Sequence, residues 1–298
     1  MTYSIVARDP NTGELGVAVQ SRYFAAARLV PWAEAGVGAV ATQSFTETAY
    51  GPRGLALMRS GMSAPDALAK LVQEDAGEAL RQVAMVDAQG RVAVHTGARC
   101  VFAAGHRAGE QVSVQANMME KATVWDAMLD AYQHTRGDLA ERMMAACEAG
   151  QREGGDIRGK QSAALIVVPG QPSDRPWQDQ IFDLRIDDHP DPIGELRRLL
   201  DFARCHQRVE AATQKASMGE LEAALAELEA CCRAYPKEPE FASRRALFLA
   251  GAGRIPEAVQ RLAELRATHP NWIETMRRFA KAGAIPVTPE QIDMLTSQ

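Results

Sequence analysis

Short apolar and β-branched runs predict strands in the part of the chain before residue 190. The runs at 2–7 and 15–21 flank the turn-forming sequence D-P-N-T-G, which predicts a β-hairpin at the start of the chain. Further strands are expected at 36–44, at 82–97 as two strands around an Ala-Gln-Gly turn, and at 111–116, 162–168 and 180–186. The run SAALIVV at 162–168 is apolar almost throughout, which predicts burial on both of its faces.

Apolar residues at helical spacing predict helices between these strands. Helices are expected near 52–60 and 64–75, the second led by Ser63 with a proline early in its first turn. Two more are expected within 120–152, on either side of Arg136-Gly137. Runs of strands, a pair of helices and then more strands predict an α+β fold in which helices cover the sheets.

Past Pro192 the pattern predicts helices only, and it contains an internal repeat. Residues 219–236 align with residues 253–270 at an offset of 34, with Gly, Ala, Leu and Pro in matching positions. This period and these positions resemble the tetratricopeptide repeat. Residues 240–251 are expected to form the first helix of the second repeat and 271–282 a closing helix. We therefore expect two domains, 1–195 and 196–298, the second of them small, all-α and tetratricopeptide-like.

Charge and composition narrow the classes of partner. The net charge of -5 over 298 residues argues against nucleic acid or an anionic membrane as the main partner, because such binders usually carry a basic surface. The first 20 residues include three charged side chains, unlike a signal peptide, and no apolar run is long enough to span a membrane. Five cysteines without CxxC spacing are typical of reduced thiols. A cytoplasmic protein is expected.

Thr2 is the first candidate for chemistry. Methionine aminopeptidases remove Met1 when the second residue is small, and removal would leave a hydroxyl and a free α-amine on Thr2. The amine, with a reference pKa of about 7.7–8.0, would then be the base that activates the hydroxyl as a nucleophile. The alternative is that Thr2 simply starts an edge strand.

Six segments of the chain together resemble a known family. They are TYSIVARDPNTGELGVAVQSR, AGVGAVATQS, AYGPRGLALM, VDAQGRVAVHTG, CVFAAGH and GGDIRGKQSAALIVV, and they are similar to the bacterial family called domain of unknown function 1028, over about residues 1–200. That family is placed in the N-terminal-nucleophile (Ntn) hydrolase superfamily. The resemblance implies a four-layer αββα sandwich, hydrolysis of an amide without a cofactor, Thr2 as the nucleophile, and a homo-oligomer.

The end of the first hairpin departs from a related pattern. The hairpin resembles the start of proteasome β-subunits, where the second strand ends in Asp-Ser-Arg. Gln20-Ser21-Arg22 stands here, so Gln20 replaces the acid, and 23–44 contains no lysine. Ser21 and Arg22 are still expected at a substrate site. The missing charges favour an alternative, a non-catalytic scaffold or binding protein whose helical tail binds a protein partner through residues 206–298.

Gln43, Ser44 and Arg53 are further site candidates. Gln43 and Ser44 end a predicted strand, where backbone N–H groups or the Gln amide are placed to stabilise an oxyanion; polar caps at a strand exit are the alternative. Arg53, in Y-G-P-R-G, offers a planar fork to a substrate carboxylate, or else ties its loop to the scaffold.

The loop GGDIRGKQS at 154–162 completes the predicted site. Its glycines permit unusual backbone angles, and it carries Asp156, Arg158 and Gln161 directly before the buried strand. An Asp–Arg clasp that closes a helix-to-strand turn is the alternative. The spacing of His95, Cys100 and His106 matches no zinc motif, so we expect no metal. The substrate expected from all of these features is a small-molecule amide.

Overall fold

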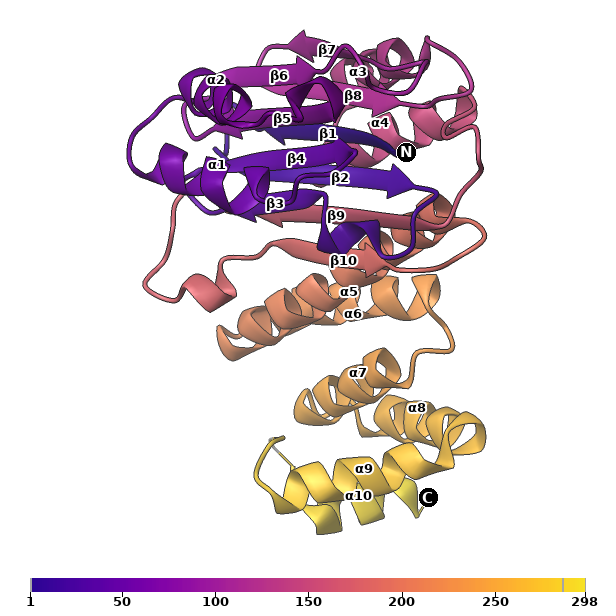
Figure 1. Cartoon of the computed structure of the whole chain (residues 1–298). Helices are drawn as coiled ribbons and strands as arrows, with labels where there is room; N and C mark the ends of the chain where they lie inside the picture. The colour runs from indigo at the N-terminus through magenta and orange to yellow at the C-terminus, as the bar shows by residue number, and fades with distance from the viewer. Residues whose placement is uncertain (1, 286, 298) are drawn as a thin grey trace. The chain divides into compact units, whose positions relative to one another are not determined.

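The first hairpin lies at the centre of a six-stranded antiparallel sheet (Figure 1). A computed structural model of the chain describes residues 2–285 and 287–297. In it β1 (Thr2–Arg8) pairs with β2 (Leu15–Ser21) on one side and with β8 (Val112–Asn117) on the other. With β7 (Gly105–Gly109), β9 (Ser162–Val168) and β10 (Phe182–Ile186), the strand order is β10-β9-β2-β1-β8-β7. The predicted hairpin is therefore confirmed, and so is full burial of β9.

A second antiparallel sheet has four strands. They are β3 (Pro31–Glu34), β4 (Gly38–Ser44), β5 (Arg81–Asp87) and β6 (Val92–Thr96), in that order across the sheet. β4, β5 and β6 confirm the predicted strands with small shifts at their ends. β3 and β7 were not predicted, because β3 has only four residues and β7, with the sequence GHRAG, carries no apolar alternation.

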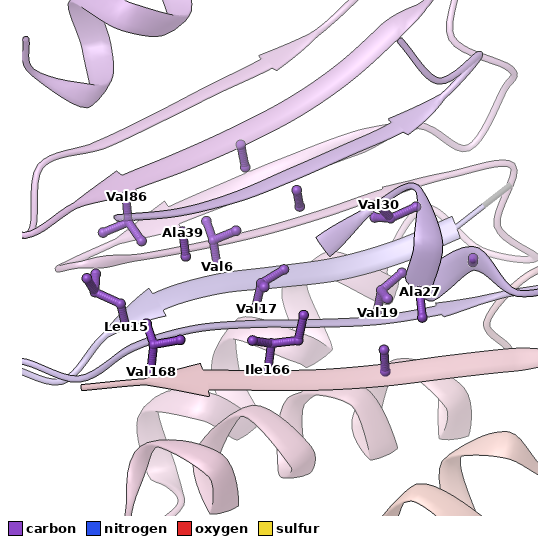
Figure 2. Packing of buried hydrophobic residues seen from close by; sticks show 14 of the residues in the cluster. Val6, Leu15, Val17, Val19, Ala27, Val30, Ala39, Val86, Ile166 and Val168 are labelled. Carbon is purple, nitrogen blue, oxygen red and sulfur yellow. The ribbon is translucent and has the colours of Figure 1, made fainter. Parts of the chain in front are cut away.

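The two sheets pack face to face around an apolar core. Alternate residues of β1 and β2, among them Val6, Val17 and Val19, point toward Ala39 and Val86 of the second sheet (Figure 2). This follows from the two-residue period of a strand, which places every second side chain on the same face.

Helices cover the outer face of each sheet. α1 (Tyr50–Arg59) and α2 (Ala64–Glu74) pack on the four-stranded sheet, and α3 (Val124–His134) and α4 (Leu139–Arg152) pack on the six-stranded one. Ser63 caps α2 as expected, because its side chain accepts a hydrogen bond from the Asp66 N–H. Gly16 of β2 lets α4 approach closely, since a Cβ there would lie 2.6 Å from Met143 Sδ. The predicted α+β class is confirmed.

Past Pro192 the described chain is helical, as predicted. The helices are α5 (Pro192–Ser217), α6 (Leu221–Ala234), α7 (Pro239–Gly251), α8 (Ile255–Thr268), α9 (Pro270–Lys281) and α10 (Pro289–Thr296). The chain divides into two compact units, Met1–Leu200 and Asp201–Gln298. Among the helices of the described ranges, none combines the length and apolar character that a membrane span requires.

The internal repeat corresponds to equivalent helices, α6 and α8. The small and large residues that match between the repeats, Ala224 with Ala258 and Leu228 with Leu262, are all buried. The matching glycines, Gly219 and Gly253, precede the two helices with φ of 86° and 73°, angles that disfavour a side chain. The repeat therefore reflects both the packing and the turns of this unit.

Candidate functional site

Thr2 lies at the start of β1, in the interior of the six-stranded sheet. Its residue is only 5% exposed, and its Oγ1 donates a hydrogen bond to Ser21 Oγ at 3.0 Å. The interpretation of Thr2 as the start of an edge strand is wrong, because β1 has a partner strand on each side. Met1, whose removal the nucleophile hypothesis requires, lies outside the described residues.

Thr2 and Ser21 line a cavity of about 410 Å³, which is in the size range of small-molecule sites. Four site candidates from the sequence meet there: Thr2, Ser21, Ser44 and Arg158. The other described lining residues are Tyr23, Ala26, Leu29, Val30, Phe45 and Thr46. The wall thus combines hydroxyl groups, an apolar surface and one guanidinium.

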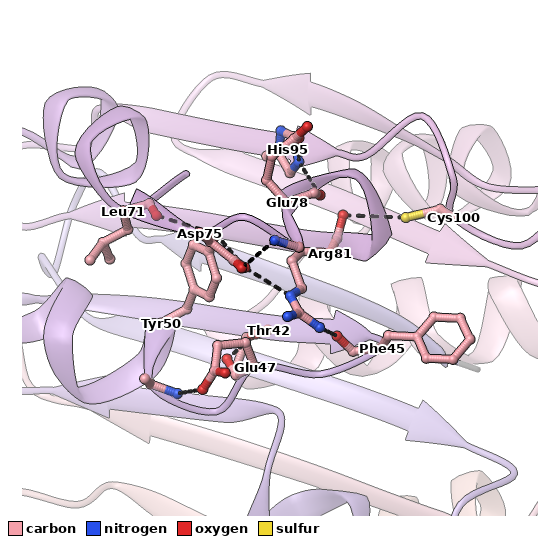
Figure 3. Close-up of polar contacts among 12 residues, drawn as sticks. Thr42, Phe45, Glu47, Tyr50, Leu71, Asp75, Glu78, Arg81, His95 and Cys100 are labelled. Atoms are coloured by element: carbon pink, nitrogen blue, oxygen red, sulfur yellow. Dashed lines mark hydrogen bonds and ion pairs between the residues drawn. The ribbon is translucent and has the colours of Figure 1, made fainter. Parts of the chain in front are cut away.

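Ser44, which lines this cavity, has a strained backbone conformation. Its φ is +74°, a region that non-glycine residues seldom occupy and that persists only where the surrounding structure enforces it. Arg81 enforces it here: Arg81 Nη1 donates to the carbonyl oxygen of Phe45 at 2.6 Å (Figure 3). The Phe45 N–H in turn donates to the carbonyl of Leu80 at 3.3 Å.

Arg81 is itself oriented by Asp75. Its Nε donates to Asp75 Oδ2 at 2.8 Å, and the same oxygen accepts a hydrogen bond from the Tyr50 hydroxyl at 3.2 Å (Figure 3). The hydrogen bond from Arg81 lowers the pKa of the Asp75 carboxyl. This network of Tyr50, Asp75 and Arg81, called here the Arg81 network, fixes the loop that presents Ser44, Phe45 and Thr46 to the cavity.

Gln43 lies beside Thr2 but does not line the cavity. Its Nε2 donates to the carbonyl of Thr2 at 3.3 Å and to Gln82 Oε1 at 2.8 Å, and its Oε1 accepts from Ser4 Oγ at 2.7 Å. It belongs to a polar layer buried between the sheets, whose other members are Ser4, Gln82, Ser113, Gln115 and Asn117. The Gln43 amide therefore bonds within this polar layer and to the start of β1.

Asp156 lies just beyond the start of β1. Its Oδ2 accepts a hydrogen bond from the N–H of Arg22, the residue after Ser21, at 3.1 Å. On the other side it forms a bridge with Met119, close to the end of β8. The loop at 154–162 thus crosses the sheet where β1 begins.

Arg158 forms a two-bond ion pair with Asp156. Its Nε and Nη2 donate to the two carboxylate oxygens at 3.1 and 2.7 Å, so the Asp–Arg clasp is present, and Arg158 also lines the cavity. Burial raises the pKa of the Asp156 carboxyl to about 6, although the N–H groups of Arg158 and Arg22 oppose this by donating to it. Asp156 itself does not line the cavity.

Arg22 and Gln161 brace the loops instead of lining the cavity. Arg22 Nη1 donates to Gln161 Oε1, and Gln161 Nε2 donates to Asp188 at 3.1 Å. Ser162, which sequence reasoning did not single out, donates to the carbonyl of Tyr23 at 2.7 Å and accepts from the Ala26 N–H. These bonds hold the loop after β2 against the start of β9.

Arg53 is the one predicted site residue that the structure does not bring near the cavity. It is on α1 and forms an exposed ion pair with Glu74 of α2. With Glu47 and Tyr50 it lines a separate hollow. Arg53 therefore does not line the cavity of Thr2. Its ion pair joins α1 to α2, which fits the alternative that Arg53 ties its segment to the rest of the fold.

The apolar wall of the cavity was missed by sequence reasoning. Phe45 follows directly after the end of β4, and Tyr23 lies two residues after the end of β2; they remain 47% and 55% exposed. A large aromatic residue within two positions of a strand end was the available signal. The remaining apolar lining comes from Ala26, Leu29 and Val30, which carry no polar mark in the sequence.

His95, His106 and Cys100 each contact a different partner. His95 Nε2 lies 2.9 Å from the carbonyl of Glu78, and His106 Nδ1 lies 2.9 Å from Thr96 Oγ1, while Cys100 Sγ donates to the carbonyl of Arg81. Within residues 2–285 and 287–297, no group of three or more His, Cys, Asp or Glu side chains is placed to hold a metal ion.

Comparisons with known proteins identify a family for the first unit. The model of a family of unknown function, DUF1028, matches residues 2–196. The crystal structure of protein SPO2555 from Silicibacter pomeroyi, described as DUF1028, is 31% identical with a TM-score of 0.61, over 68% of this chain and 85% of that chain. Anbu, an ancestral β-subunit from Yersinia bercovieri, is 10% identical with a TM-score of 0.33, over 66% and 92%. No curated protein matches.

Proposed function

The chain belongs to the DUF1028 family of unknown function, and from the geometry of its cavity we propose that the first unit is an Ntn-type amidohydrolase with Thr2 as its nucleophile. The observation that carries this proposal is the hydrogen bond from Thr2 Oγ1 to Ser21 Oγ at the wall of a small-molecule-sized cavity. A buried hydroxyl held in one orientation beside such a cavity is what a nucleophile requires.

The reaction needs Met1 to be removed. The free α-amine of Thr2 then takes the proton of its own hydroxyl while Oγ1 attacks the carbonyl carbon of the amide. The C–N bond breaks, the amine product leaves with that proton, and an ester between the acyl group and Thr2 remains. Water hydrolyses this ester with the same amine as base, which releases the acid and restores the hydroxyl. No cofactor takes part in this scheme.

Ser44 lines the cavity with Thr2. In this proposal the Ser44 hydroxyl donates to the oxyanion. The Thr2 amine, whose reference pKa is about 7.7–8.0, acts as the base near neutral pH.

The wider architecture supports the same assignment. Two sheets packed face to face with helices on both outer faces are the layers expected of an Ntn sandwich. The equivalent helices α6 and α8 support a tetratricopeptide-like tail. We further propose self-association, and a protein partner for residues 206–298.

The first experiment is the intact mass of untagged protein, followed by turnover of a panel of small amides. We expect a mass short by one methionine, and a fall in turnover of about a thousandfold or more in Thr2→Ala, because the nucleophile is gone. Thr2→Ser should retain turnover. Thr12→Ala, an exposed threonine in the turn of the same hairpin, is the matched control. Retained Met1 or an active Thr2→Ala would refute the proposal.

A non-catalytic binding protein is the second candidate. The observation that favours it is that the described lining residues include no Asp, Glu or Lys, so a general base would have to come from the α-amine. Gln20, at the position of the acid in proteasome β-subunits, is fully buried and does not line the cavity. Retained Met1 together with a ligand-binding cavity would support this candidate.

A further inference from the structure

The lining of the Thr2 cavity also indicates which amide would fit it. Resting on the proposed function, we infer that the substrate joins an apolar, ring-sized acyl group to an amine that carries a carboxylate. Two independent features of the wall lead to this class: an aromatic and aliphatic surface on one part of it, and a fixed guanidinium on another.

The apolar feature consists of the half-exposed Tyr23 and Phe45 together with Ala26, Leu29 and Val30. Large apolar side chains that stay about half exposed in the wall of a cavity mark a binding surface. The backbone of Phe45 is held in place, because Arg81 binds its carbonyl. An exposed aromatic ring of this kind favours an apolar group of similar size by stacking or edge contact.

The charged feature is Arg158. Its side chain is 37% exposed and lines the cavity, and Asp156 fixes the plane of its guanidinium through Nε and Nη2. None of the described lining residues is acidic, so the positive charge of the Arg158 guanidinium is the feature of the wall that attracts an anionic group such as a carboxylate.

The features come from three loops that converge on Thr2. Tyr23 follows β2, Phe45 follows β4, and Arg158 precedes β9. All three residues line one cavity with Thr2, so a ligand whose carboxylate contacts Arg158 and whose ring contacts Phe45 shares that cavity with the Thr2 hydroxyl. The inference places the amide bond between these two ends within reach of Thr2 Oγ1.

The test is binding to Thr2→Ala, which separates recognition from turnover. The probes are N-benzoylglycine, its neutral amide N-benzoylglycinamide, and N-acetylglycine, which lacks the ring. By calorimetry, N-benzoylglycine should bind about tenfold more tightly than either of the others, the size of effect expected from one charge-assisted contact or one buried ring. Equal affinity for the charged and neutral probes would overturn the inference.

Variants in the Thr2→Ala background locate the two contacts. Arg158→Gln should abolish the preference for charge, and Phe45→Ala the preference for the ring. Arg185→Gln is the matched control for charge, because Arg185 pairs with Asp183 through the same two atoms at the same spacing in sequence. Phe102→Ala, 89% exposed and outside the lining, is the control for the ring. A control that changes a preference as much as its partner variant would contradict the inference.

The two proposals fail separately. Turnover that survives in Thr2→Ala refutes the proposed function, whereas the ranking of the three probes needs no turnover. If Arg158→Gln does not fold, the ranking on Thr2→Ala and on Phe45→Ala still decides the inference.

Discussion

Buried glutamines near Thr2 have opposite environments. The Gln43 amide bonds to Gln82, Ser4 and the carbonyl of Thr2. Both polar atoms of the equally buried Gln20 side chain lack a hydrogen-bond partner among the described residues. The two residues have the same side chain and the same burial and differ in their hydrogen-bond partners. We therefore expect the two side chains to contribute differently to the free energy of unfolding.

Replacing each glutamine by methionine, which has a similar shape, tests this difference. Gln43→Met should lower the free energy of unfolding by about 1–3 kcal/mol, because it leaves buried polar partners unsatisfied. Gln20→Met should be neutral or stabilising, since it removes an amide that makes no such bond. Urea denaturation of both variants measures the effect; an equal loss in the two would contradict the assignment.

Asp75 predicts a pH dependence of stability. Arg81 lowers the pKa of Asp75 in the folded chain, so the stabilisation is complete above the unfolded value of about 3.9 and is lost as pH falls through the lower folded value. Asp75→Asn should therefore be less stable than the wild type at pH 7, and the gap should close below about pH 4. Urea denaturation at pH 7, 5 and 3 checks the sign. A gap that widens in acid would show that Asp75 does not stabilise as a carboxylate.

At the scale of elements, the exit from β4 shapes the site. The strand ends at Ser44 with a positive φ, and the next two residues, Phe45 and Thr46, line the cavity. Thr42 Oγ1 donates to the carbonyl of Glu47 at 3.0 Å, while the Arg81 network holds Phe45 from the other side. The loop is thus constrained by both β4 and β5.

Arg81→Gln should release this loop. Loss of the bond to the Phe45 carbonyl should speed hydrogen exchange of the Phe45 N–H by about tenfold or more, because hydrogen bonds to charged groups are among the stronger ones. Arg107→Gln, which removes an exposed ion pair with Asp126, should leave that exchange unchanged. Mass spectrometry of peptides covering 40–50 measures it. Unchanged exchange in Arg81→Gln would remove Arg81 from the support of the site.

At the scale of the whole molecule, each unit has its own apolar core. In the first unit a core lies between the two sheets, with Val17 among its members (Figure 2). In the second, residues of α6, α7, α8, α9 and α10 form a core that includes Leu262. Because the cores are separate, we expect a destabilising substitution in the core of one unit to promote unfolding of that unit and not of the other.

Leu262→Ala should destabilise the second unit by about 2–5 kcal/mol, through lost burial and the cavity left behind. Hydrogen exchange should then rise in 221–296 but not in β1 and β2. Val17→Ala is the reciprocal variant, with faster exchange expected in the sheets. Faster exchange throughout the chain in either variant would show that the units unfold together.

Most elements followed from the sequence because their signals are local. Short apolar and β-branched runs located β1, β2, β4, β5, β6, β8, β9 and β10, and helical spacing with Ser63 as a cap located α2. The repeat at an offset of 34 predicted the helices after Pro192. The resemblance to DUF1028 singled out Thr2 and the loop of Asp156 and Arg158, and the family match is confirmed.

The sequence by itself therefore determined most helices and strands, the family, and which polar residues are candidates for a site near Thr2. Only the tertiary structure decided which candidates share the cavity: Ser21, Ser44 and Arg158 line it with Thr2, while Gln43 turns into the polar layer and Arg53 lies elsewhere. It also brought in Tyr23 and Phe45. The physical reason is that a strand's alternation is set by local geometry, whereas a loop side chain is placed by contacts with residues far away in the chain, such as Arg81 for Phe45.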